Sequence, residues 1–120
     1  MAKHDALKAQ IETLRNAIPE LKGVLVASTE GLPVAHSLSN GTDPNRVAAM
    51  AAAASSLGRR ISDSLSTGSL NEVSIRSEEG MLFVYSAGKG VLAVMGPQGS
   101  NAGLIHLEAR GTADDISKLF

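Results

Sequence analysis

Residues 43–66 read DPNRVAAMAAAASSLGRRISDSLS, and this stretch decides the fold. Asp43 is a favoured N-cap residue and Pro44 suits the first helical position, so the pair predicts where a helix begins. Alanine, the strongest helix former, occupies six of the seven positions from Ala48 to Ala54. We therefore expect one long helix whose small side chains let a neighbouring backbone come close.

The predicted helix carries two apolar stripes. The first has spacings of four and three and suits packing on a sheet; it consists of Val47, Ala51, Ala54, Gly58, Ile61 and Leu65. The second lies beside it and consists of Met50, Ala53 and Leu57. An apolar arc this wide exceeds what a helix on the outside of a monomer needs. Either the same helix of a second copy covers the second stripe, or this is an ordinary core helix rich in alanine.

Length and composition indicate one small domain with a thin core. A chain of 120 residues fits a single domain, 1–120. Its aromatic side chains are one tyrosine and two phenylalanines, and many apolar positions are alanine. Each alanine buries little area, so extra burial in an oligomer is physically favourable.

The charge pattern argues against several classes of partner. The net charge is −1, and the longest run of basic residues is the pair Arg59 and Arg60, which disfavours nucleic acid. The longest apolar runs are a few residues, far below the ~20 that a membrane span needs. Residues 1–10 are polar and the chain has no cysteine, so we expect a cytoplasmic protein without membrane insertion.

The remaining elements follow from periodicity and turn residues. Leu7, Ile11 and Leu14 predict a helix over 2–17, and short apolar runs predict strands over 24–28, 32–37, 70–76, 81–85 and 91–95. In the strand 70–76, Val73 and Ile75 face one way and polar residues the other, which is typical of a half-exposed strand. Residues 101–120 fit a strand or a helix, and their apolar spacing favours a helix. The order α-β-β-α-β-β-β-α predicts an α+β fold with a five-stranded, mostly antiparallel sheet sandwiched between helices.

Catalytic chemistry finds no support in the sequence. The histidines, His4, His36 and His106, lie far apart without metal-ligand spacing. No Gly-x-Ser-x-Gly motif occurs, and the Gly-rich loop 96–103 lacks the Gly-Lys-Ser/Thr ending of a nucleotide loop. We therefore expect neither catalytic residues nor a cofactor nor a metal, and predict a protein that is not an enzyme.

Three stretches together resemble the roadblock/dynein light chain family, in its prokaryotic form. They are GVLVASTEGLPVA (23–35), the alanine helix from Asp43-Pro44 to Leu57-Gly58-Arg59-Arg60-Ile61, and NAGLIHLEAR (101–110). The resemblance covers nearly the whole chain and implies a roadblock/profilin-like fold. In that family the last stretch is a helix, which agrees with its apolar spacing.

The resemblance also implies a homodimer in which the sheets join edge to edge through the third strand and the alanine helices lie side by side. The interface would contain Met50, Ala53, Leu57, Val73 and Ile75. Relatives of this family regulate or tether small Ras-like GTPases, including those that control polarity and gliding in bacteria. By this analogy, a GTPase would meet the outward helix positions Arg46, Ala49, Ser56, Arg59, Arg60 and Asp63.

Two functions remain open at this point. The first is a non-catalytic homodimeric regulator or scaffold that binds a small GTPase through the helix 44–66. The second is a small-molecule sensor or lone structural module without a GTPase partner, since α+β sandwiches of this order also hold ligands. A ligand pocket needs apolar lining and converging polar groups, of which this core supplies few.

Overall fold

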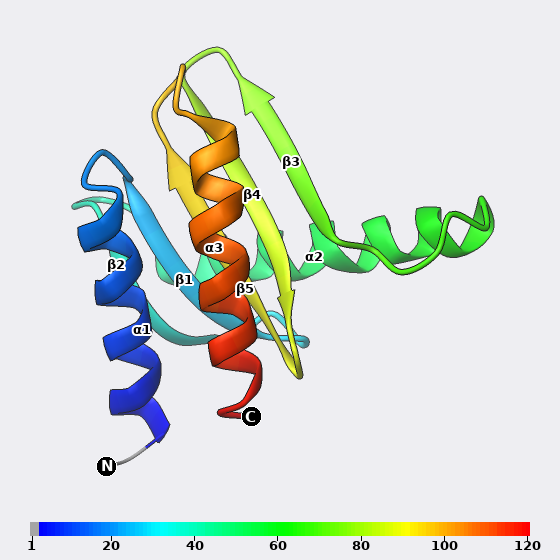
Figure 1. Ribbon diagram of the computed structural model, residues 1–120, viewed down its shortest axis with the longest axis horizontal. Coiled ribbons are helices and arrows are strands. Elements are labelled where there is room, and N and C mark those ends of the chain that lie inside the picture. Colours follow the sequence, from blue (N-terminus) through cyan, green and yellow to red (C-terminus); the bar gives the residue numbers. More distant parts are fainter. Residues whose placement is uncertain (1–2) are drawn as a thin grey trace.

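The computed structural model describes residues 3–120, which form three helices and five strands (Figure 1). In chain order the elements are α1 (Lys3–Ala17), β1 (Gly23–Ser28), β2 (Pro33–Leu38), α2 (Pro44–Ser64), β3 (Glu72–Ser77), β4 (Gly80–Ala87), β5 (Gly90–Gly96) and α3 (Ala102–Ser117). This is the predicted order, and the α+β class is confirmed.

Side-chain caps fix the starts of α2 and α3. The Asp43 carboxylate accepts a hydrogen bond from the Asn45 N–H at 3.0 Å, and the Asn101 side chain accepts one from the Leu104 N–H at 3.1 Å. Each cap satisfies an amide that has no partner within its helix. The segment after Asn101 is therefore a helix, as its spacing favours, and not a strand.

The predicted boundaries differ from the structure by a few residues. The predicted start of the first helix at Ala2 lies outside the described residues, and its end at Ala17 is confirmed. Helix α2 ends at Ser64 and not at Ser66, where a positive φ of 55° turns the chain away. Strand β3 begins at Glu72, later than the predicted residue 70, and residues 65–71 connect it to α2.

The five strands form one sheet in the order β2-β1-β5-β4-β3, and every neighbouring pair is antiparallel. Two-residue turns join β3 to β4 and β4 to β5, which makes a meander, while β1 and β2 form a separate hairpin. Pairing of β1 with β5 unites the two parts. The strands at the two edges of the sheet are consequently β2 and β3.

Helices cover both faces of the sheet, so the predicted sandwich is confirmed (Figure 1). Helices α1 and α3 lie on one face over a core that contains the largest buried side chains, among them Phe83 and Tyr85. Helix α2 lies on the other face over a smaller core of mostly alanine and valine. The alternation along each strand divides its side chains between these two cores.

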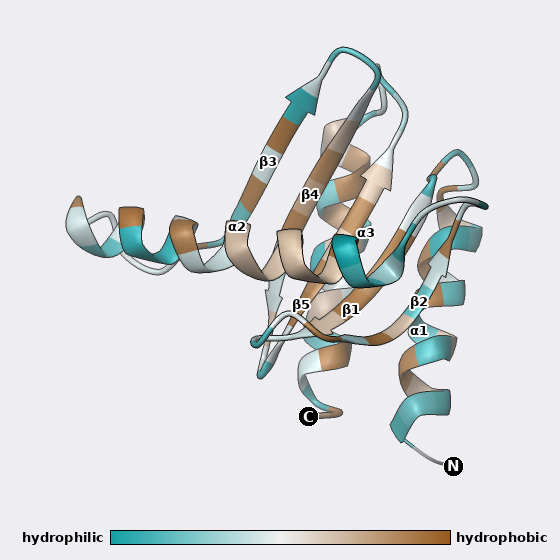
Figure 2. Cartoon of the chain, turned by 180° about the vertical axis from the view of Figure 1, so that it is seen from behind, coloured by the Kyte–Doolittle hydropathy of each residue, from teal (hydrophilic) through white to brown (hydrophobic). Residues whose placement is uncertain are grey.

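The buried face of α2 differs from the predicted first stripe. Ala48, Ala51 and Ser55 are the fully buried residues of this helix, and the prediction included only Ala51. Ile61 and Leu65, which the prediction placed on the sheet, are 49% and 67% exposed. Figure 2 shows the reason: the C-terminal turns of α2 extend past β3, so the sheet ends before the helix does.

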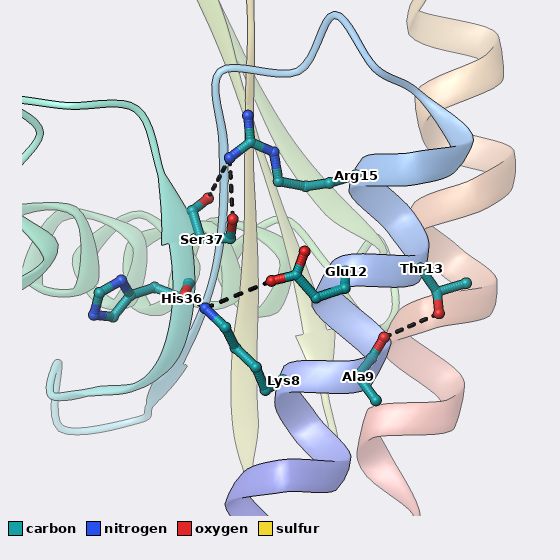
Figure 3. A network of polar contacts seen from close by, with 7 residues as sticks. All are labelled: Lys8, Ala9, Glu12, Thr13, Arg15, His36 and Ser37. Carbon is teal, nitrogen blue, oxygen red and sulfur yellow. Dashed lines mark hydrogen bonds and ion pairs between the residues drawn. The ribbon is translucent and has the colours of Figure 1, made fainter.

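Side chains of α1 cover the outer edge of β2 (Figure 3). His4 Nδ1–H donates to the carbonyl of Val34 at 3.1 Å, and Lys8 Nζ donates to the carbonyl of His36. One helical turn advances about 5.4 Å and two strand residues advance about 6.6 Å, so a donor at every fourth helix position can reach alternate carbonyls.

Further along α1, Arg15 contacts the end of β2. Its guanidinium donates to the Ser37 carbonyl at 3.2 Å and to the Ser37 hydroxyl at 3.1 Å. A third bond, to the carbonyl of Leu21 at 2.8 Å, fixes the connection that follows α1. Between Lys8 and Arg15, Glu12 forms an ion pair with Lys8, with 3.7 Å between Oε1 and Nζ (Figure 3).

Candidate functional site

Large apolar side chains are exposed on α2 and on β3, the strand at the edge of the sheet that α2 crosses. They are Met50 (58%), Leu57 (55%), Ile61 (49%) and Leu65 (67%) on α2 and Ile75 (43%) on β3, and we call them the α2–β3 surface. Leu82 and Met95 are half-buried and share the sheet face of Ile75 through cross-strand pairing. Large apolar patches of this kind mark interaction sites on soluble proteins.

The structure places the predicted dimer residues on or beside this surface. Met50, Ala53 and Leu57 are exposed along one stripe of α2. Val73 is half-buried, and a Cβ added at Gly58 would lie only 2.9 Å from its Cγ2, so α2 and β3 approach closely there. Ile75 lies farther along β3, clear of α2. Sequence reasoning missed Ile61 and Leu65 for this surface, because periodicity cannot show that a helix outruns its sheet.

The outer edge of β3 differs from that of β2. Strand β3 pairs only with β4, and no hydrogen bond within residues 3–120 reaches its outward backbone groups. An uncovered edge strand presents a row of donors and acceptors that another strand can pair with. The sheet is thus protected at β2 and open at β3.

The six predicted GTPase-facing positions are all exposed, but they do not form one compact stripe. Arg46 precedes Met50 by four residues and so lies in line with the predicted dimer stripe. Ala49 faces the β1–β2 turn, since its Cα lies 3.4 Å from a Cβ built at Gly31. Ser56 and Asp63 are exposed farther along the helix, and Arg60 lines a shallow hollow with Leu57, Ile61 and Leu65.

Arg59 is the one member of the six that holds a hydrogen bond to the body of the helix. It donates to the hydroxyl of Ser55 at 3.1 Å, and Ser55 is 2% exposed. Part of its cationic group is therefore committed to α2 itself, whereas Arg60 at the next position is exposed.

A polar cluster that sequence reasoning missed joins α3 to the sheet. The Tyr85 hydroxyl lies 2.7 Å from His106 Nδ1, and Arg110 forms an ion pair with Glu72 of β3. Burial, followed by the negative charge of Glu72, raises the pKa of Tyr85 well above its ordinary value. The hydrogen bond to Glu72 raises the pKa of Arg110. Only the three-dimensional pairing of Glu72 with Tyr85 brings these residues together.

Within residues 3–120, no group of three His, Asp or Glu side chains converges in a way that holds a metal ion. A hollow of about 500 Å³ lies beside the β3–β4 turn, where Ile75, Leu82 and Met95 meet Lys22 and Glu79. It is part of the same region as the α2–β3 surface. In the described part of the chain, none of the helices combines the length and apolar character needed to cross a membrane.

Comparison with known proteins identifies the family. The model of the Roadblock/LC7 domain matches residues 8–96. The chain belongs to this family. An uncharacterized protein of Methanocaldococcus jannaschii is 32% identical over 105 residues, which are 88% of this chain and 92% of the relative. The resemblance to the roadblock family is thereby confirmed.

Solved structures share the fold of this chain. MglB of Myxococcus xanthus superposes with a TM-score of 0.89 at 16% identity, over 100% of this chain and 91% of that one. A Roadblock/LC7 domain of Streptomyces avermitilis gives 0.83 at 23% identity, over 92% and 94%. The family model stops at residue 96, and the MglB superposition extends the likeness to α3.

Proposed function

We propose that this Roadblock/LC7 domain forms a homodimer through β3 and α2 and that the dimer binds a small Ras-like GTPase. It would regulate the nucleotide cycle or the location of that GTPase in the cytoplasm without catalysing a reaction itself, as one domain spanning 1–120. The observation that carries the proposal is the coincidence of an open β3 edge with the exposed α2–β3 surface. Family membership supports the class of partner.

A two-fold axis beside β3 accounts for both features at once. Antiparallel pairing of β3 with the β3 of a second copy would satisfy the open backbone groups and continue the sheet. The part of α2 that extends past β3 would then lie over the sheet of the partner and bury Ile61 and Leu65. Met50, Ala53, Leu57, Val73 and Ile75 would complete the interface.

The GTPase would meet the positions of α2 that this interface leaves free. Ser56, Arg60 and Asp63 are exposed, and Arg60 borders the α2–β3 surface at Leu57 and Ile61. Ala49 and Arg59 adjoin them, and Arg46 lies at the border with the dimer stripe. Exposed residues with little intramolecular bonding are free to form such contacts.

The decisive experiment is affinity capture with this protein as bait, from native lysate supplemented with GDP or with a non-hydrolysable GTP analogue. The purified GTPase is then titrated against this protein. We expect a Ras-like GTPase to be enriched in one nucleotide state and Arg60→Glu to weaken its binding. Lys89→Glu makes the same charge change in the distant β4–β5 turn and serves as the control. Failure to enrich any GTPase in either state would count against the proposal.

The hollow beside the β3–β4 turn keeps a small-molecule sensor as the alternative. Native mass spectrometry of the purified protein tests it directly, because a bound metabolite adds a fixed mass to the dimer or the monomer. A ligand that is displaced when Ile75 or Met95 is enlarged would assign the hollow to a small molecule. An unliganded dimer supports the protein-binding function.

A further inference from the structure

Strand β3 carries a sequence that is complementary to itself when reversed. Cross-strand pairing places Glu72, Ser74 and Arg76 opposite Tyr85, Phe83 and Met81, on the face that α1 and α3 cover. Val73 and Ile75 lie on the opposite face, where Val84 and Leu82 are their partners. One face of β3 thus carries an acidic, a hydroxyl and a basic side chain in that order, and the other face carries two β-branched apolar side chains.

The backbone groups that face the open edge of β3 belong to its polar residues, Glu72, Ser74 and Arg76. A two-residue turn joins Ser77 to Gly80, so these two residues form a hydrogen-bonded pair. In an antiparallel ladder such pairs alternate, and Val73 and Ile75 therefore direct their N–H and C=O groups toward β4. Glu72, Ser74 and Arg76 direct theirs outward, where a second strand would pair.

A two-fold axis restricts the ways in which two β3 strands can pair. Directly opposed side chains of two antiparallel strands lie on the same face of the sheet. The axis must therefore lie midway between two copies of one residue, and such an axis is said to pass through that residue. An axis through Ser74 sets Glu72 opposite Arg76 and Val73 opposite Ile75, twice each. An axis through Ile75 sets Ser74 opposite Arg76 and Val73 opposite Ser77, and it leaves Glu72 facing Glu78.

We infer that the two-fold axis passes through Ser74 and that two symmetric pairs between Glu72 and Arg76 fix the register and the choice of partner. The inference rests on the proposed homodimer and names the residues that select a second copy of this chain. Opposite charges directly across a strand pair stabilise it, and like charges destabilise it. The adjoining Val73–Ile75 pairs add apolar contact on the α2 side.

Arg110 prepares Glu72 for this role. Its guanidinium bonds Oε1 of Glu72, and Oε2 has no hydrogen-bond partner within residues 3–120. The bond orients the carboxylate at the beginning of β3, while its second oxygen stays available to an arginine from across the axis. Helix α3 makes no other ion pair with β3 in the described part of the chain, so Arg110 acts as a positioning residue.

Charge reversal tests the register. Because of the two-fold axis, one substitution changes two Glu72–Arg76 pairs of the dimer. We expect Glu72→Arg and Arg76→Glu each to raise the dissociation constant of the homodimer about tenfold. Mixed in equal amounts, the two variants present only opposite charges to each other, and a heterodimer should dominate in native mass spectrometry. Circular dichroism checks that each variant folds. Arg76→Glu leaves the Glu72–Arg110 pair intact, so it tests the register even if Glu72→Arg disturbs the strand.

The control pair is Glu30→Arg and Lys89→Glu, in the exposed β1–β2 and β4–β5 turns. It repeats the change in net charge away from β3 and should give a statistical mixture of dimers. If the unmodified protein is a dimer and the β3 variants also mix statistically, the proposed register is wrong but the homodimer is not contradicted. An unmodified protein that stays monomeric, with no pairing between the β3 variants, would overturn both.

Discussion

The hydroxyl of Tyr85 shows how one buried group makes stability depend on pH. Tyr85 is 1% exposed and its pKa is raised by burial and by Glu72, so the folded state favours the neutral phenol. A raised pKa contributes stability that is complete below the unfolded pKa of about 10 and is lost as the pH rises toward the folded value. The folded protein should therefore lose stability above about pH 10.

We predict that Tyr85→Phe abolishes this part of the alkaline destabilisation, which is at most about 1.4 kcal/mol per pH unit for one proton. At neutral pH the variant should be less stable by about 1 kcal/mol, because His106 Nδ1 loses its partner. Urea unfolding between pH 7 and 11 measures both effects. Tyr85 is the one tyrosine of the chain, so its own absorbance reports its ionisation. Equal pH dependence in the two proteins would contradict the assignment.

At the scale of elements, α2 carries four large exposed apolar side chains, Met50, Leu57, Ile61 and Leu65. We predict that Leu57→Glu separates the dimer while lowering the free energy of unfolding of the monomer by less than about 0.5 kcal/mol, since Leu57 is 55% exposed. Burying the new carboxylate at the interface would be costly. Sedimentation velocity measures the change in mass.

Leu107→Glu is the matched control for this prediction. Leu107 is 71% exposed on α3, which lies on the other face of the sheet. The same substitution there should leave the dimer intact. If both variants dissociate, or neither does, the interface does not lie on α2.

The cover of β2 by α1 leads to a second prediction at this scale. Lys8→Met removes the donor to the outward carbonyl of His36, and the edge of β2 then becomes available to other strands. We expect faster concentration-dependent aggregation, measured by light scattering. Lys89→Met removes the same charge from the β4–β5 turn and should aggregate at the unmodified rate. Equal rates would show that the Lys8 side chain is not needed to protect the edge.

The elements differ in how far their sequence determined them. Asp43-Pro44 and Asn101 act through local hydrogen bonds, so the starts of α2 and α3 could be predicted closely. Period-two alternation placed Val73 and Ile75 on one face of β3, and the cross-strand pairing agrees, but Val73 is half-buried while Ile75 is exposed. The orientation of α2 could not be predicted, because it depends on where the sheet ends. The same non-local cause hid the Glu72–Arg110 pair, whose members are far apart in the chain.

For the molecule as a whole, association and stability should be linked. A partner that binds the folded state alone raises the apparent stability by mass action. We predict that the melting temperature increases with protein concentration for the unmodified chain and becomes independent of concentration for Leu57→Glu. Scanning calorimetry over a hundredfold range of concentration tests this. A constant melting temperature in both proteins would mean that folding does not depend on the second copy.

Helices α1 and α3 share one face of the sheet, and the first described turn of α1 and the end of α3 lie near each other at one end of it (Figure 1). This arrangement determines where attachments can be made. A fluorescent fusion or a surface anchor at either of these points projects from the side away from α2. In the proposed dimer, all such attachment points fall on one side of the extended sheet. A chip coated with the anchored protein would then present every α2 helix to the solution.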